Sequence, residues 1–167
     1  LSHEEIAAIR TKELEQAGRF LGASSFHSLN YGDGTLENIP RLAGEIAEII
    51  RSVKPEAIFC PDPWLMYEAH YDHIVTGKAA AHAFMSSSLP RYPKGTTTQP
   101  WQPIAIGFYF TANPNLVVDT TDAYDKKFRA IELHRSQFND ETLAMYRVYF
   151  KEKGRQLAEE KDFEIGE

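Results

Sequence analysis

Apolar side chains recur at every third or fourth position in several stretches of the chain, which is the spacing of an amphipathic helix. The first stretch opens at Ser2, which can form a capping box with Glu5, and stops at Gly22. The second has Pro40 in its opening turn and is broken after Lys54 by a proline. The pattern predicts helices over residues 2–21, 40–53, 74–85, 122–134 and 140–160.

Short apolar runs between these helices predict strands. Residues 57–60 are apolar throughout, as in a strand that is buried on both faces of a parallel sheet. Residues 86–103 hold too many prolines for a helix or a central strand, so we expect an irregular excursion there. The predicted strands cover residues 25–29, 57–60, 104–110 and 115–119.

The order of the predicted elements is that of an α/β protein. Helices alternate with short strands, so we expect a layered sheet flanked by helices. Because the order begins on a helix, we expect a further strand and its partner to belong upstream of the first residue. The length of 167 residues favours a single domain over residues 1–167.

Composition narrows the functional classes. The 18 basic and 24 acidic residues give a net charge of -6 without a basic cluster, which argues against nucleic acid as a partner. The single cysteine excludes an intramolecular disulfide and a cysteine-based zinc knuckle, and it fits a reducing compartment. No apolar run is long enough to cross a bilayer. We therefore expect a soluble, cytoplasmic protein with no membrane partner.

The segment YEAHYDH, residues 67–73, is the main candidate for chemistry. It follows the strand predicted at residues 57–60, and open parallel sheets bind ligands at the carboxyl ends of their strands. His70 and His73 can face one ligand if a helix starts there, and Asp72 can orient an imidazole. A solvated loop with one histidine at a helix cap explains the same pattern. Because a catalytic zinc usually needs three protein ligands, the spacing alone leaves the site incomplete.

Two aromatic residues lie beside the histidines. The faces of Trp64 and Tyr67 suit the apolar side of a pyranose ring, so both are candidates for stacking on a sugar. Packing of the loop against the sheet explains them equally well. A phosphate-binding or dinucleotide-binding enzyme is disfavoured, because neither glycine signature occurs in the chain.

Further short motifs are distributed along nearly the whole chain. They are Ile9-Arg10 with Glu13, Leu21-Gly22, Leu29-Asn30-Tyr31 with Asp33, Cys60-Pro61-Asp62-Pro63-Trp64, Tyr67-Glu68 leading to His70, Val118-Asp119 with Thr121-Asp122, Lys127, Ala130-Ile131 and His134-Arg135-Ser136-Gln137-Phe138. Together these residues resemble the PIG-L (LmbE-like) family of zinc-dependent N-deacetylases, and within it the members that are similar to diacetylchitobiose deacetylase.

The resemblance implies a Rossmann-like, three-layer α/β sandwich with a mainly parallel sheet, here without its N-terminal strand segment. It also implies removal of the acetyl group from N-acetylglucosamine-type substrates, such as chitobiose-like sugars, by water that Zn²⁺ activates. By the same resemblance, His73 would be a zinc ligand, His70 the acid that protonates the leaving amine, and Asp72 the acid that supports this histidine. Arg10 and Asp33 match positions that line the sugar pocket. Family members often form trimers or hexamers, so a homo-oligomer is expected.

The chain departs from the family pattern in two places. Tyr71 stands where the family usually has proline, which loosens the backbone but leaves His70, Asp72 and His73 in register. The family's first strand ends in a His-Pro-Asp-Asp segment that supplies two zinc ligands and the general base, and residues 1–167 contain no such segment. We therefore expect a chain that is incomplete at both ends and inactive as an isolated polypeptide.

A second hypothesis comes from another functional class. A noncatalytic α/β module would keep the sugar pocket without assembling a metal site. A His-Pro-Asp-Asp segment encoded upstream in the same reading frame would favour the enzyme, and its absence would favour the binding module.

Overall fold

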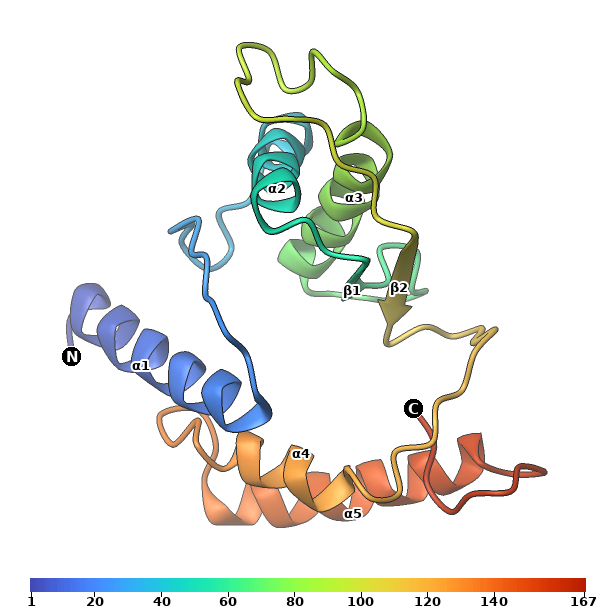
Figure 1. The fold of residues 1–167 in the computed structure, drawn as a ribbon. Coiled ribbons are helices and arrows are strands. Elements are labelled where there is room, and N and C mark those ends of the chain that lie inside the picture. Colours follow the sequence, from blue (N-terminus) through green and yellow to red (C-terminus); the bar gives the residue numbers. More distant parts are fainter. The chain divides into compact units, whose positions relative to one another are not determined.

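The computed structural model describes residues 1–167 and contains helices and two short strands (Figure 1). The elements in chain order are α1 (His3–Leu21), α2 (Ile39–Val53), β1 (Ala57–Pro61), α3 (Tyr71–Ser86), β2 (Ala105–Tyr109), α4 (Tyr124–Ile131) and α5 (Asp140–Leu157). None of the helices is long and apolar enough to cross a membrane.

The chain divides into two compact units. Residues Leu1–Phe26 and Asn115–Glu167 form the first unit, and His27–Pro114 form the second. The first unit contains α1, α4 and α5, whereas the second contains α2, α3 and both strands. The single domain expected over residues 1–167 stays a prediction.

The helix ends follow the capping signals in the sequence. The Ser2 side chain accepts from the Glu5 N–H, and the Glu5 carboxylate accepts from the Ser2 N–H, so the predicted capping box is confirmed. Gly22 ends α1 with a φ of 106°, a conformation that glycine adopts without strain. Pro40 lies in the first turn of α2, and Lys54 ends that helix in the left-handed region. All five predicted helices are present, although their ends differ by up to three residues.

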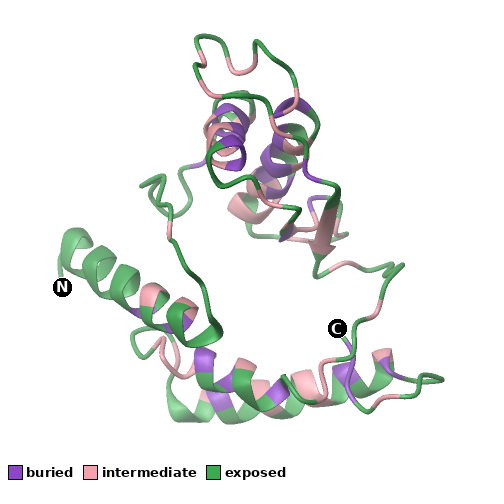
Figure 2. Ribbon diagram, in the orientation of Figure 1, coloured by how far each residue is buried: buried purple, intermediate pink, exposed green.

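The second unit is a βαβ arrangement with α2 packed on α3. Strands β1 and β2 pair in parallel, with Ala57 opposite Ala105 and Pro61 opposite Tyr109. Small side chains let α2 and α3 approach closely, and Figure 2 shows buried residues along both helices. The buried cluster consists of Leu36, Leu42, Ala43, Ala47, Ile50, Val75, Ala79 and Ala83.

Three strand predictions need correction. Strand β1 is not buried on both faces: Phe59 is 74% exposed, whereas Ile58 packs on the helical core. The reason is that side chains alternate along a strand and only one face of this two-stranded sheet has helices against it. Residues 25–29 form no strand, and residues 115–119 form only an isolated antiparallel bridge between Asp119 and Gly166. An apolar run becomes a strand only where a partner is available for its backbone hydrogen bonds.

The proline-rich segment between α3 and β2 is irregular, as predicted, and Arg51 of α2 anchors it. The Arg51 side chain is 2% exposed. It donates hydrogen bonds to the carbonyl oxygens of Ser87 (2.9 Å), Thr98 (3.2 Å) and Leu89, and to the Thr96 hydroxyl at 3.1 Å. The buried guanidinium thus has hydrogen-bond partners for its charge and ties three parts of the segment to α2.

Replacing Arg51 with methionine should destabilise the protein by about 3 kcal/mol, because hydrogen bonds from a charged group contribute about 1.5–3 kcal/mol each and the cost of burying the guanidinium offsets part of that gain. Methionine keeps most of the apolar stem, so packing changes little. Urea denaturation measures the effect, and Arg41→Met is the matched control because Arg41, on the same helix, is exposed and pairs only with Glu45 one turn on. Equal stability of the two variants would show that the Arg51 hydrogen bonds are not needed.

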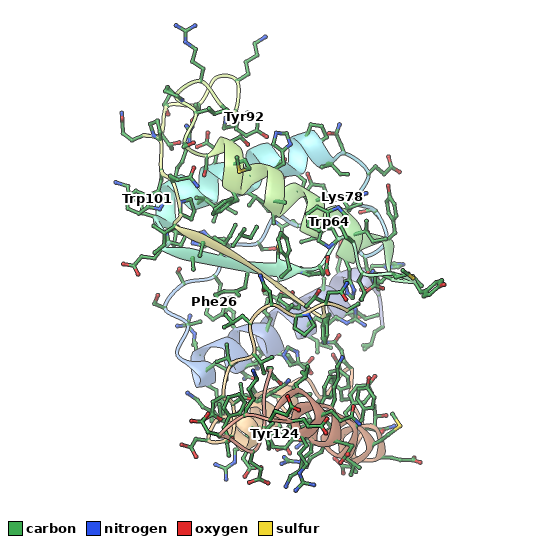
Figure 3. The ribbon with its side chains drawn as sticks, turned by 90° about the vertical axis from the view of Figure 1, so that its right-hand side faces the viewer. Phe26, Trp64, Lys78, Tyr92, Trp101 and Tyr124 are labelled. Carbon is green, nitrogen blue, oxygen red and sulfur yellow. The ribbon has the colours of Figure 1, made fainter.

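Trp101 and Tyr92, labelled in Figure 3, belong to this same segment and pack against the core of α2 and α3. The Trp101 indole N–H donates to the carbonyl oxygen of Pro55 at 2.8 Å. These contacts make Trp101 an internal anchor of the segment.

The first unit has its own apolar cluster. Tyr124 and Phe128 of α4 are buried together with Ile165, and Tyr146 and Phe150 of α5 pack on them. Helix α1 contacts α4 in the same unit. The unit therefore consists of helices held by aromatic side chains rather than by a sheet.

Candidate active site

The candidate site begins at the carboxyl end of β1. The Asp62 N–H donates to the Tyr109 carbonyl oxygen at 3.0 Å, which extends the pairing of β1 with β2 by one residue. The Asp62 carboxylate then accepts from the Trp64 N–H at 2.8 Å and closes a tight turn. This bond assigns Asp62 a structural part in the turn. The turn directs the chain away from the sheet toward the histidines.

Gly77 of α3 lets the helix pack directly under this turn. A Cβ atom at position 77 would contact the Pro61 carbonyl oxygen and would lie 2.9 Å from two Pro63 side-chain atoms. Because Gly77 has no side chain, the loop of residues 61–63 can pack directly against α3.

Replacing Gly77 with alanine should lower stability by about 1–3 kcal/mol, the usual cost of overpacking. The backbone of residues 61–63 cannot give way as a flexible side chain would, so the loop has to move. Lys78→Ala, at the exposed neighbouring position on the same helix (Figure 3), should change stability by less than about 0.5 kcal/mol. Thermal or urea unfolding measures both variants, and unchanged stability in Gly77→Ala would refute the close packing.

His70 and His73 lie on the same side of the start of α3. His70 occupies the N-cap position, but its side chain makes no capping hydrogen bond. The two imidazole rings stack with their centroids 4.3 Å apart and their planes 11° apart. The expectation that both rings face the same way is therefore confirmed, and His70 is not used as a helix cap.

Glu68 holds this pair from the preceding loop. One carboxylate oxygen accepts from the His70 backbone N–H at 2.7 Å, and the other lies 3.1 Å from Nδ1 of His73. The hydrogen bond from the His70 N–H, followed by that from His73, lowers the pKa of Glu68 below its usual value. The carboxylate is thus ionised at neutral pH. Sequence reasoning gave Glu68 no role, although a glutamate two residues before a helix cap is a signal that could have pointed to it.

The aspartates of the site are arranged differently from what the resemblance implies. Asp72 accepts from the Gly34 N–H at 2.6 Å, and its other oxygen is buried without a hydrogen-bond partner. No hydrogen bond joins Asp72 to His70. Instead, an oxygen of Asp33 lies 3.7 Å from Nε2 of His70. Asp72 therefore fixes the turn that carries Asp33, and Asp33 is the acid that faces His70.

The two aromatic candidates project from the same loop. Trp64 is 66% exposed and contacts Phe108 edge to face at a centroid distance of 5.3 Å. Tyr67 is 94% exposed and has a φ of 66°, an uncommon conformation for an aromatic residue. Packing of the loop does not account for the exposed Tyr67 ring. Both rings can therefore offer a face to a ligand.

Arg10, the last of the predicted site residues, lies in the first unit. Arg10 lies on α1 in the first unit, whereas the other six predicted site residues lie in the second. Close to Arg10 in sequence, Glu13 is buried and accepts from the N–H and the hydroxyl of Ser136 at 2.7 and 2.6 Å. The Ser136 hydroxyl, together with its backbone N–H, lowers the pKa of Glu13. This pair joins α1 to the segment that follows α4.

Of the possible metal ligands in the second unit, His73 is suited to bind a metal and Cys60 is not. Among residues 1–167, no group of three or more His, Cys, Asp or Glu residues is arranged to hold a metal ion. Cys60 is buried, and burial with a smaller effect of Asp62 raises the pKa of its thiol to about 11, so it is not a ready ligand. His73 differs, because a carboxylate lies 3.1 Å from its Nδ1 atom, and a carboxylate behind the ring is the usual arrangement around a metal-bound histidine.

The amino-acid sequence matches a known protein family. Residues 1–84 match the PIG-L family, described as GlcNAc-PI de-N-acetylase. The chain therefore belongs to the PIG-L family. It is 32% identical over 154 residues to diacetylchitobiose deacetylase of Thermococcus kodakarensis, covering 90% of this chain and 58% of that protein.

Two further relatives extend the comparison. A probable N-acetyl-alpha-D-glucosaminyl L-malate deacetylase 2 of Bacillus anthracis is 28% identical over 155 residues, covering 89% of this chain and 64% of that protein. The solved structure of N,N'-diacetylchitobiose deacetylase from Pyrococcus horikoshii superposes with a TM-score of 0.91 at 35% identity, covering all of this chain and 64% of that one. This likeness confirms the predicted α/β fold class. The chain spans about three fifths of the length of these relatives.

Proposed function

We propose that the protein is a zinc-dependent deacetylase that hydrolyses the acetamide group of N-acetylglucosamine-type substrates. The observation that carries the proposal is the stacked pair of His70 and His73 at the end of β1, with Asp33 facing the first ring and Glu68 holding the second. Membership of the PIG-L family supports it, as does the similarity to proteins that are named deacetylases of diacetylchitobiose and of a glucosaminyl malate.

In this proposal His73 contributes one zinc ligand through Nε2. The other ligands would come from residues outside the 167 described here, as the family resemblance implies. Bound zinc would supply a Lewis acid that polarises the acetyl carbonyl and lowers the pKa of water to about 7. Glu68 keeps the His73 ring in place for this purpose.

His70 acts on the leaving group. An amine leaves an amide only when its nitrogen is protonated, so hydrolysis needs an acid at that position. The His70 side chain is 47% exposed and can reach a substrate, and the Asp33 carboxylate lies 3.7 Å from its Nε2 atom. After water has added to the carbonyl carbon and given a proton to a base, which the resemblance places outside residues 1–167, His70 would give its proton to the nitrogen as the C–N bond breaks, leaving acetate and a free amine. Asp72 serves this step indirectly by holding the turn of Asp33.

The sugar would bind against the exposed loop. Trp64 and Tyr67 present aromatic faces beside the histidine pair, which suits the apolar face of a pyranose ring. Asp33 can accept a hydrogen bond from a sugar hydroxyl, and Arg10 stays a predicted sugar-binding residue. The N-acetyl sugar is therefore the proposed partner.

One observation favours the second candidate, a noncatalytic sugar-binding module: residues 1–167 alone provide no three-ligand metal group. Zinc content and amine release from diacetylchitobiose separate the two functions. They should be measured both for the 167-residue polypeptide and for the complete protein of its reading frame. We expect stoichiometric zinc and turnover in the complete protein and neither in the polypeptide. Sugar binding without zinc or turnover in the complete protein would support the binding module instead.

A further inference from the structure

We propose that Glu68 is a positioning residue that fixes the tautomer and the orientation of the His73 ring, so that Nε2 presents its lone pair to a cation. This inference deepens the proposed function and rests on it for the identity of the cation. It concerns a carboxylate for which no role was predicted from the sequence.

The first step is the chemistry of the contact. An ionised carboxylate only accepts hydrogen bonds, so the ring atom that faces it has to carry a hydrogen. Glu68 lies 3.1 Å from Nδ1 of His73, and a neutral imidazole carries one N–H. The proton is therefore on Nδ1, and Nε2 is the nitrogen with a free lone pair. Without Glu68, nothing in the described contacts of His73 selects between the two tautomers.

The second step is that both carboxylate oxygens are engaged. One oxygen accepts from the His70 backbone N–H at 2.7 Å, so Glu68 cannot rotate without breaking that bond. The His73 ring is also confined by the stacked ring of His70, at a centroid distance of 4.3 Å. Carboxylate and ring thus hold each other in one arrangement before any ligand binds.

The third step is exposure. The Glu68 side chain is 19% exposed, whereas that of His73 is 45% exposed. The hydrogen bond lies on the shielded side of the ring, and a large part of the ring remains open to solvent. The start of α3 next to this carboxylate also favours its negative charge, because the helix dipole is positive there.

Glu68→Gln tests the inference with little change in shape. The amide has only one oxygen, and it faces two donors, the His70 N–H and the His73 ring. If the oxygen stays with the backbone, the amide NH₂ faces Nδ1, and the ring accepts there and moves its proton to Nε2. Glu37→Gln is the matched control, since it removes an equal charge from an exposed position in the same unit.

The readout is the ring tautomer of His73 by nitrogen NMR on the metal-free complete protein, labelled at histidine and measured at alkaline pH, where histidine rings are neutral. The His73 signals are assigned by their loss in His73→Gln. We expect the Nδ1–H form in the wild type and in Glu37→Gln, and a shift toward the Nε2–H form in Glu68→Gln. A predominant Nε2–H form in the wild type would overturn the inference even if no variant folds. An unchanged tautomer in folded Glu68→Gln and also in Glu68→Ala, which has no side-chain acceptor, would overturn it as well.

Zinc titration against a chromophoric chelator gives a second readout. We expect Glu68→Gln to bind zinc about 10–100-fold more weakly, the usual effect of losing a carboxylate behind a metal-bound histidine. Equal zinc affinity of Glu68→Gln and wild type would contradict the inference. A wild type that binds no zinc would count against the proposed function, whereas the tautomer measurement would still decide the role of Glu68.

Discussion

Replacing His73 with alanine is expected to remove zinc from the complete protein and to abolish deacetylation. The reason is that His73 is the imidazole of the site whose Nδ1 is held by a carboxylate, which leaves Nε2 as the proposed zinc ligand. Zinc sites of enzymes usually have three protein ligands, so the loss of one leaves too few to hold the ion tightly. Metal analysis after dialysis and amine release from diacetylchitobiose measure the two effects.

His82→Ala is the control for this variant. His82 lies on the same helix as His73 but is exposed, and its ring lies 5.4 Å from the ring of Tyr92. It should keep full zinc content and activity. Stoichiometric zinc in the His73→Ala protein would show that His73 is not a ligand.

The second large effect is expected for His70→Gln, with kcat lower by about 10²–10⁴-fold, the usual contribution of a general acid. Zinc content should not change, because His70 is proposed to move a proton and not to bind the metal. The substitution should also leave α3 intact, since the His70 ring makes no capping hydrogen bond.

A change of leaving group makes this test specific. An acetamide of a weakly basic aromatic amine needs less help from an acid than an acetylated amino sugar does. The rate deficit of His70→Gln should therefore be smaller on the aromatic acetamide. An equal deficit on both substrates would argue against proton donation and for a role of His70 in binding or structure.

Much of the helical fold could be predicted because its signals are local. The capping box of Ser2 and Glu5 and the glycine at position 22 define both ends of α1 within a few residues of sequence. Strands could be predicted less well, because a strand depends on a partner that is distant in sequence. Residues 57–61 pair with residues 105–109 and form a sheet, whereas residues 25–29, which include two serines and a histidine, form no strand.

The candidate site could be predicted only where its geometry depends on residues that are close in sequence. His70 and His73 are three residues apart at a helix start, so their shared direction follows from helix geometry. The contact between Asp72 and Gly34 could not be predicted in this way, because it joins positions 38 residues apart. The position of Glu68 two residues before the helix cap is a local signal for its bond to the His70 N–H, whereas its contact with the His73 ring depends on how the loop before α3 folds back onto the helix.

The fold therefore supports the proposed chemistry through a small number of fixed contacts. Gly77 sets the height of the loop after β1, Asp72 holds the turn of Asp33, and Glu68 holds the two histidines at the start of α3. These contacts position the acid and the proposed ligand before a substrate binds, which is the arrangement that catalysis requires.

The most direct test of the account is a crystal structure of the complete protein grown with zinc, with anomalous scattering recorded at the zinc edge. The account predicts a zinc peak at about 2.0–2.1 Å from Nε2 of His73, the usual distance for histidine ligands. A zinc peak bound elsewhere, with His73 Nε2 turned away from it, would contradict the account.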